Sequence, residues 1–211
     1  MKTSTKTLFA TLLTGIVLTS TAMTTFATGN SIIYETGTNA AKPEATVNGV
    51  NRIWASGHVK VILTQNEKEG ITAGENFNAK TTFIQRKGNT LYINSIESGQ
   101  VTIKVSIKDL HRVEAAGSAT VVTSNNFDVK HLQVFLSQGA KAKLSAMSAS
   151  LYTVVSDDAV LKLSGSTDQH TLIATNLKNV RLDSFHSLRT SSKVADYAAI
   201  RSNRLIAERL N

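Results

Sequence analysis

A short apolar–basic–apolar pattern returns at fixed spacing in the second half of the chain, and this repeat constrains the fold more than any other feature. Its copies are Ala142-Lys143-Leu144, Leu161-Lys162-Leu163 and Val180-Arg181-Leu182, and each begins 19 residues after the one before. The alternation of apolar and polar residues has the period of a β-strand, not that of a helix. A repeat of about 20 residues built from such segments is typical of a solenoid whose turns stack on one another. We therefore expect an all-β chain that forms a parallel β-helix.

In such a fold, the repeat divides into residues that face the core and residues that face solvent. The basic residue of each copy stands between two inward apolar residues, so it points outward, and stacked turns lie about 4.8 Å apart. The outward ladder is either a solvated face that discourages edge pairing or a strip that binds anions along a polymer, such as phosphates or uronates. We take Lys143, Lys162 and Arg181 as the candidate ligand-binding residues. The predicted inward column is Val122, Leu144, Leu163, Leu182 and Ile200.

The first residues are typical of a secretory signal. Lys2 and Lys6 precede the apolar run 8–17, which is followed by small residues and Thr25-Phe26-Ala27. That run is half the roughly 20 residues that span a bilayer, so we predict a signal peptide over 1–27 that is cleaved after Ala27. No later stretch is long and apolar enough to cross a membrane. The mature protein is then exported, to the periplasm or the cell surface.

The rest of the chain predicts one domain behind a short leader. The polar stretch 28–46, which holds the only proline, reads as a flexible leader, and 47–211 is long enough for one core. Residues 203–211 carry leucines and arginines and are predicted to cap the last turn. The absence of cysteine excludes disulfides and thiolate metal sites.

The N-terminal half reads as strand after strand. Residues 58–63 alternate, and 81–85 is expected to pair with 90–94 through the Gly88-Asn89 turn, which supplies the positive φ that a hairpin needs. Residues 101–107 alternate as well. We therefore expect this half to lean toward antiparallel pairing before the repeats begin at Leu110.

The order of these motifs resembles the head GIN domain family, whose members are described as putative auto-transporter adhesins of bacteria. The resemblance rests on Val50 to Val61, on Gly88-Asn89-Thr90-Leu91-Tyr92-Ile93, on 101–110 and on Ala116-Gly117-Ser118-Ala119. It implies a right-handed β-helix or β-roll on an exported protein, and it implies no catalytic motif. The family tends to repeat Gly-Ser-Gly at its turns, whereas this chain has Gly139-Ala140, Asp157-Asp158 and Lys178-Asn179 there. Asp and Asn tolerate the left-handed backbone, so these turns can survive.

Charge narrows the partners. The repeat half, 129–211, holds eleven Lys and Arg against six Asp and Glu, while 28–128 holds ten against nine. A basic face attracts acidic polysaccharide, anionic lipid such as lipopolysaccharide, or nucleic acid. Export argues against nucleic acid. Another surface protein is a further candidate partner.

The sequence offers little chemistry for a metal or a cofactor. His58, His111, His131, His170 and His186 are scattered, and no His-Glu-x-x-His motif is present. Calcium requires six to eight oxygen ligands, and the Asp157-Asp158 pair has few carboxylates near it in sequence, so a turn is the favoured interpretation. We expect no metal and no cofactor.

The functional hypothesis that follows is a non-catalytic, adhesin-like binding protein of the cell envelope. No Gly-x-Ser-x-Gly elbow is present, and Gly165-Ser166 lies in a turn-like run. Trp54, the only tryptophan, should face away from the core because Ile53 beside it faces inward. The alternative hypothesis is a polysaccharide-active β-helix enzyme, a lyase or a hydrolase. Such an enzyme needs clustered acids, bases or metal ligands, and the sequence shows no such cluster.

Overall fold

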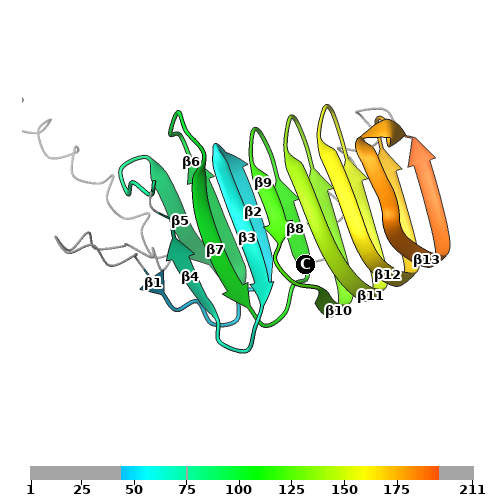
Figure 1. Ribbon diagram of the computed structural model, residues 1–211, viewed down its shortest axis with the longest axis horizontal. Coiled ribbons are helices and arrows are strands. Elements are labelled where there is room, and N and C mark those ends of the chain that lie inside the picture. Colours follow the sequence, from blue (N-terminus) through cyan, green and yellow to red (C-terminus); the bar gives the residue numbers. More distant parts are fainter. Residues whose placement is uncertain (1–43, 75, 195–211) are drawn as a thin grey trace, which may run out of the picture.

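The computed structural model describes residues 44–74 and 76–194, and in this part of the chain the fold is all-β. Its strands form one 13-stranded mixed sheet, and one short 3-10 helix, η1, is the only helical element among these residues (Figure 1). The elements are β1 (Glu44–Ala45), β2 (Arg52–Gly57), β3 (Val59–Gln65), β4 (Gly70–Ala73), β5 (Thr82–Lys87), β6 (Thr90–Ser95), β7 (Val101–Ile107), β8 (Arg112–Ala115), β9 (Thr120–Thr123), β10 (Phe127–Leu136), β11 (Lys141–Val155), β12 (Val160–Ala174), η1 (Leu177–Asn179) and β13 (Val180–Val194).

The sheet curls into a half-barrel because β11 belongs to two neighbourhoods at once. Lys141–Lys143 pair with β9, whereas the second part of the same strand pairs with β10. The strand order therefore runs from β1 through β4, β7, β3 and β9 to β11 and returns through β10, β8, β2, β6 and β5. We call the first series, with the first parts of β11–β13, wall 1. The second series, with the remaining parts of β11–β13, is wall 2.

Both walls send alternate side chains into one shared core. In wall 1, Val59, Val61 and Leu63 of β3 are fully buried, and in wall 2, Val134 and Leu136 of β10 are as well. All five belong to a single buried cluster that draws on both walls. The period-two alternation of the sequence thus fixes which face of each strand points inward.

The repeat half pairs in parallel with the predicted step. Leu144 is the register partner of Leu163, and both are buried. Leu182 is half-buried and packs against the core, after a bulge near Leu163 shifts the register between β12 and β13. Ile200 lies outside the described residues.

The prediction was wrong at Val122. The step from β9 to β11 is 21 residues, so Val121, which is fully buried, stands opposite Ala142 in the inward position. Val122 is instead the register partner of Lys143 and faces outward. The longer connection between β9 and β11 changes the register by one residue, and a shift of one residue moves a side chain to the opposite face.

The N-terminal half was predicted to lean antiparallel, and its pairing is mostly parallel. Only β1–β4, β4–β7 and β5–β6 are antiparallel among the described strands. The β5–β6 hairpin is confirmed, with Gly88 at φ 58° in its turn. Elsewhere, consecutive strands do not pair, because the corner at Gly57 sends the chain from β2 in wall 2 to β3 in wall 1. β2 instead pairs in parallel with β6 and β8.

The corners from wall 2 to wall 1 stack four residues with left-handed backbone. Gly57, Gly117, Gln138 and Asp157 have φ between 57° and 70° and follow register-matched strand ends. Positive φ at Gly117 and Asp157 agrees with the predicted turns, whereas in the third corner it falls on Gln138 and not on Gly139. The predicted Lys178-Asn179 turn is part of η1.

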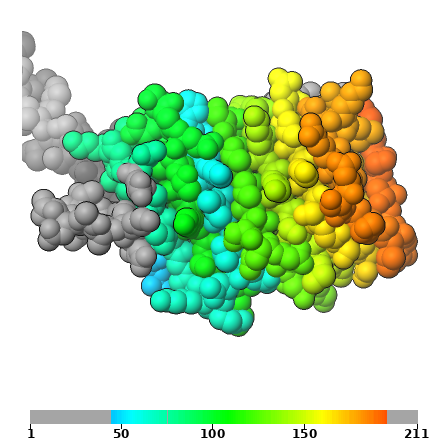
Figure 2. Space-filling view, in the orientation of Figure 1, coloured from blue at the N-terminus to red at the C-terminus, as the bar shows by residue number. Residues whose placement is uncertain are grey.

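These findings confirm the all-β prediction, while the sheet is mixed and not uniformly parallel. β1 lies inside the stretch 28–46 that the sequence assigns to a leader. The predicted signal 1–27 and the predicted cap 203–211 lie outside the described residues. No helix in the described part of the chain is long and apolar enough to cross a membrane. Figure 2 shows the strands packed side by side along the long axis, with β13 at one end.

Candidate functional site

The three predicted site residues stand side by side on the outside of wall 1. Lys143 is the register partner of Lys162, and Lys162 is the register partner of Arg181. All three are exposed, while Ala142 and Leu161, which precede the two lysines, are buried. Neighbouring strands lie about 4.8 Å apart, so three cations rise in a row across β11, β12 and β13. We call this row the basic ladder.

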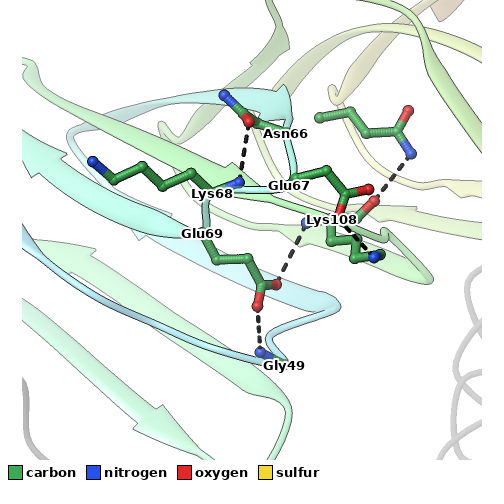
Figure 3. A network of polar contacts seen from close by, with 7 residues as sticks. Gly49, Asn66, Glu67, Lys68, Glu69 and Lys108 are labelled. Atoms are coloured by element: carbon green, nitrogen blue, oxygen red, sulfur yellow. Dashed lines mark hydrogen bonds and ion pairs between the residues drawn. The ribbon is translucent and has the colours of Figure 1, made fainter.

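No ion pair neutralises the ladder within the described residues. Lys108 shows the contrast: its Nζ lies 2.7 Å from Glu67 Oε2, and this hydrogen-bonded carboxylate raises the pKa of Lys108. The backbone around it is also held, because Glu69 accepts from the N–H groups of Lys108 and Gly49 (Figure 3). Lys108 is therefore occupied in closing the β3–β4 loop, whereas the ladder cations are available to a ligand.

Further cations share the outer face of wall 1, and sequence reasoning missed them. Lys141 is exposed next to the ladder, and Lys60 lies in its row through Thr120. Lys104 lies in the ladder's own row, separated from it by Ile62 and Val122. The alternation of residues 58–63 indicates that Lys60 faces outward, but no local signal places β3 and β7 beside β9 and β11.

The outer face of wall 2 carries a different row, with apolar and aromatic character. Trp54 lies beside Tyr92 with ring centroids 5.8 Å apart, so the predicted outward direction of Trp54 is confirmed. The Arg112 guanidinium lies 4.2 Å from the ring centroid of Phe135 and 3.3 Å from Glu114 Oε2. In register order, the row is Tyr92, Trp54, Glu114, Phe135, Val154, Ile173 and Lys193. We call it the outer row of wall 2.

The histidines are not brought together. His58 Nδ1 lies 2.6 Å from the Glu97 carbonyl oxygen, His111 Nε2 lies 2.7 Å from Asp109 Oδ2, and His131 Nδ1 lies 2.8 Å from Ser150 Oγ. His170 is buried in the core, where its Nε2 lies 2.9 Å from Thr153 Oγ1 and desolvation lowers its pKa. Within the described residues, no three His, Cys, Asp or Glu side chains come close enough to hold one metal ion.

The Asp157-Asp158 pair forms a turn. Asp157 has φ 57°, and its Oδ2 accepts a hydrogen bond of 2.8 Å from the N–H of Gln138 in the corner below. The carboxylate thus links two stacked corners.

One hollow of about 690 Å³ brings a serine, a histidine and aspartates to the same surface. It lies where β10–β13 bend from wall 1 to wall 2, and its lining includes Ser166, Asp168 and His186. Ser166 and His186 are register partners, but no hydrogen bond joins any two of these three side chains in the described part of the chain. Gly165-Ser166, read from sequence as turn-like, lies within β12. The arrangement lacks the hydrogen-bonded nucleophile and base that acyl transfer requires.

The features above describe an all-β protein that presents stacked side chains on two outer walls. Residues 49–201 match the family described as "Putative auto-transporter adhesin, head GIN domain", and the chain belongs to that family. The resemblance seen in the sequence is therefore confirmed.

Solved structures support the same fold. A putative adhesin from Bacteroides fragilis NCTC 9343 is similar with a TM-score of 0.63 and 17% identity, over 72% of this chain and 74% of that one. A putative adhesin from Parabacteroides distasonis ATCC 8503 has a TM-score of 0.55 and 12% identity, over 72% and 76%. A putative lipid binding protein from the same strain has a TM-score of 0.54 and 14% identity, over 72% and 77%. No curated protein matches this chain.

Proposed function

We propose that this chain is an exported, non-catalytic binding protein of the bacterial cell envelope, and that it engages acidic polymers through wall 1. The observation that carries the proposal is the basic ladder, in which Lys143, Lys162 and Arg181 are register partners without ion-pair partners in the described part of the chain. The adhesin descriptions of the family and of two structural neighbours support a binding role.

A row of cations favours a repeating ligand over a single small anion. One exposed ion pair contributes only about 0–1 kcal/mol. After the first contact, however, the other contacts of a linked ligand become intramolecular, so a polyanion gains from each cation in turn. Because the ladder is exposed, salt screens it, and binding should weaken strongly as ionic strength rises.

Two sources share the required chemistry of closely spaced anionic groups. One is an acidic polysaccharide with uronate groups, and the other is a lipid assembly with phosphate groups, such as lipopolysaccharide. The neighbour described as a putative lipid binding protein makes the second source worth testing. Another surface protein with an acidic face would use the same ladder.

The proposal includes two statements about the chain itself. Residues 1–27 act as a cleaved signal peptide, which directs the mature protein to the periplasm or cell surface. The stacked strands β11–β13 are successive turns of a right-handed parallel β-helix, as their parallel register supports.

The test compares two triple variants with equal loss of charge. The ladder variant replaces Lys143, Lys162 and Arg181 with Gln. The control replaces three exposed cations of wall 2, Lys87, Lys130 and Arg189, with Gln. Binding to polygalacturonate and to lipopolysaccharide vesicles is measured at low and at physiological salt.

We expect the ladder variant to bind one of these probes about 10–100-fold more weakly at low salt, as three lost contacts of up to about 1 kcal/mol each would give. The control should stay within a few-fold of the unchanged protein. Salt-insensitive binding, or equal weakening in both variants, would show that the ladder is only a solvated face.

A further inference from the structure

The outer row of wall 2 contains side chains that are buried although they face away from the core. Phe135, Val154 and Ile173 are only 4%, 3% and 7% exposed. They are register partners on three adjacent strands. Their chain neighbours Val134 and Leu172 fill the core, so alternation directs these three side chains to the outer face. They form a buried cluster separate from the core, which agrees with this direction.

Among the described residues, two side chains contact Phe135 in this cluster. The Arg112 guanidinium lies over its ring at 4.2 Å, and the Tyr152 ring lies 5.9 Å away, centroid to centroid. Val154 and Ile173 continue the row away from Arg112, toward β13. A sheet buried on both faces requires an element packed on each face. The outer row therefore has an occupant.

We propose that the occupant is the C-terminal segment of this chain, residues 195–211. Lys193, the register partner of Ile173, is next to last in β13, so the chain leaves the sheet directly beside the row. The row from Ile173 to Phe135 crosses two strand spacings, about 10 Å. Seventeen residues reach about 25 Å even as a helix. The segment supplies matching apolar side chains in Tyr197, Ile200, Leu205, Ile206 and Leu210.

The open end of the sheet beyond β13 is the other place that these residues can reach, and burial argues against it. Val194 is the register partner of the fully buried Ala174, so it belongs to an inward row, yet it is 60% exposed. Leu182 and Phe185, which pack against the core, are only partly buried. A cap over the end would cover these side chains, whereas the outer row is the surface that is covered. Docked there, the segment occupies wall 2 and leaves wall 1 as the open face.

The absence of cysteine allows a direct test in the full chain. Single reporters are introduced as Ile173→Cys in the row, Thr171→Cys at an exposed outward position of the same strand, and Leu151→Cys in the core. Each is labelled with a maleimide, in the native chain and in a chain carrying Leu205→Ser, Ile206→Ser and Leu210→Ser. The serines remove the apolar contacts of the segment without shortening it.

With the native segment, Ile173→Cys should react at least about tenfold more slowly than Thr171→Cys, because the site must open first. With the serine segment, its rate should approach that of Thr171→Cys, while Leu151→Cys stays slow. Slow labelling of Ile173→Cys in the serine chain would overturn the proposal.

Disulfide trapping gives a second test that does not depend on the serine chain. Ile206→Cys is combined with Val154→Cys in the row or with Leu182→Cys at the end of the sheet. Under mild oxidation, the pair with Val154→Cys should cross-link and the pair with Leu182→Cys should not. Cross-linking only at the end of the sheet would overturn the proposal.

Discussion

Gln138 shows how a single residue bears the strain of a corner. Its backbone has φ 59°, and the matching corners hold Gly57 and Gly117. A left-handed backbone costs a residue with a Cβ roughly 1–2 kcal/mol, which glycine avoids. We expect Gln138→Gly to raise the free energy of unfolding by about 0.5–1 kcal/mol, since the flexible unfolded chain offsets part of the gain. Equilibrium urea unfolding measures this, and a lower stability would contradict the assignment of strain.

His170 makes stability depend on pH. It is buried, and desolvation lowers its pKa below the ordinary value of about 6.5. The unfolded chain then binds a proton more readily than the folded chain, so the contribution of His170 is complete above about pH 6.5 and is lost as pH falls below that value. We expect the Tm to fall from pH 7 to pH 5, and to fall less in His170→Gln. The exposed His131→Gln should keep the full dependence, and equal slopes in the two variants would contradict this role.

At the scale of the element, the sequence predicts what is periodic and local. Strict 19-residue spacing was enough to place Leu144 beside Leu163, and the Gly88 turn was enough to predict the β5–β6 hairpin. The prediction failed at Val122 because the β9–β11 step is 21 residues and no residue pattern signals the change. The parallel pairing of β2 with β6 joins residues 38 apart, a separation at which alternation carries no information about partners.

The column itself can be tested by truncation. Leu163 is buried with a strand on each side, whereas Leu182 is half-buried on β13, which pairs only with β12 among the described strands. We expect Leu163→Ala to cost about 2–5 kcal/mol, as core truncations do. Leu182→Ala should cost distinctly less, because less apolar surface leaves water on folding there. Urea unfolding of both variants provides the comparison, and an equal or larger cost at Leu182 would contradict the column.

At the scale of the whole molecule, the curl of the sheet decides which residues form a site. The basic ladder could be predicted because its members share one repeat. Lys60 and Lys104 join the same wall only because β3 and β7 stack beside β9, and Trp54 joins Phe135 only through β8. These neighbours depend on the long-range order of strands, which a single sequence does not display. The ladder is thus the part of the site that sequence could reach.

The same stacking predicts how stability is distributed along the molecule. When each strand contacts mainly its neighbours, stability is a sum of local terms, and the end opens before the middle. β13 pairs only with β12 in the described sheet, while β3 is paired on both sides by β7 and β9. We expect amide hydrogen exchange to be fastest in β13, slower in β12 and slowest in β3. Leu182→Ala should then speed exchange in β13 and β12 and leave β3 unchanged. A uniform rise across all three strands would instead show that the molecule opens only as one cooperative unit.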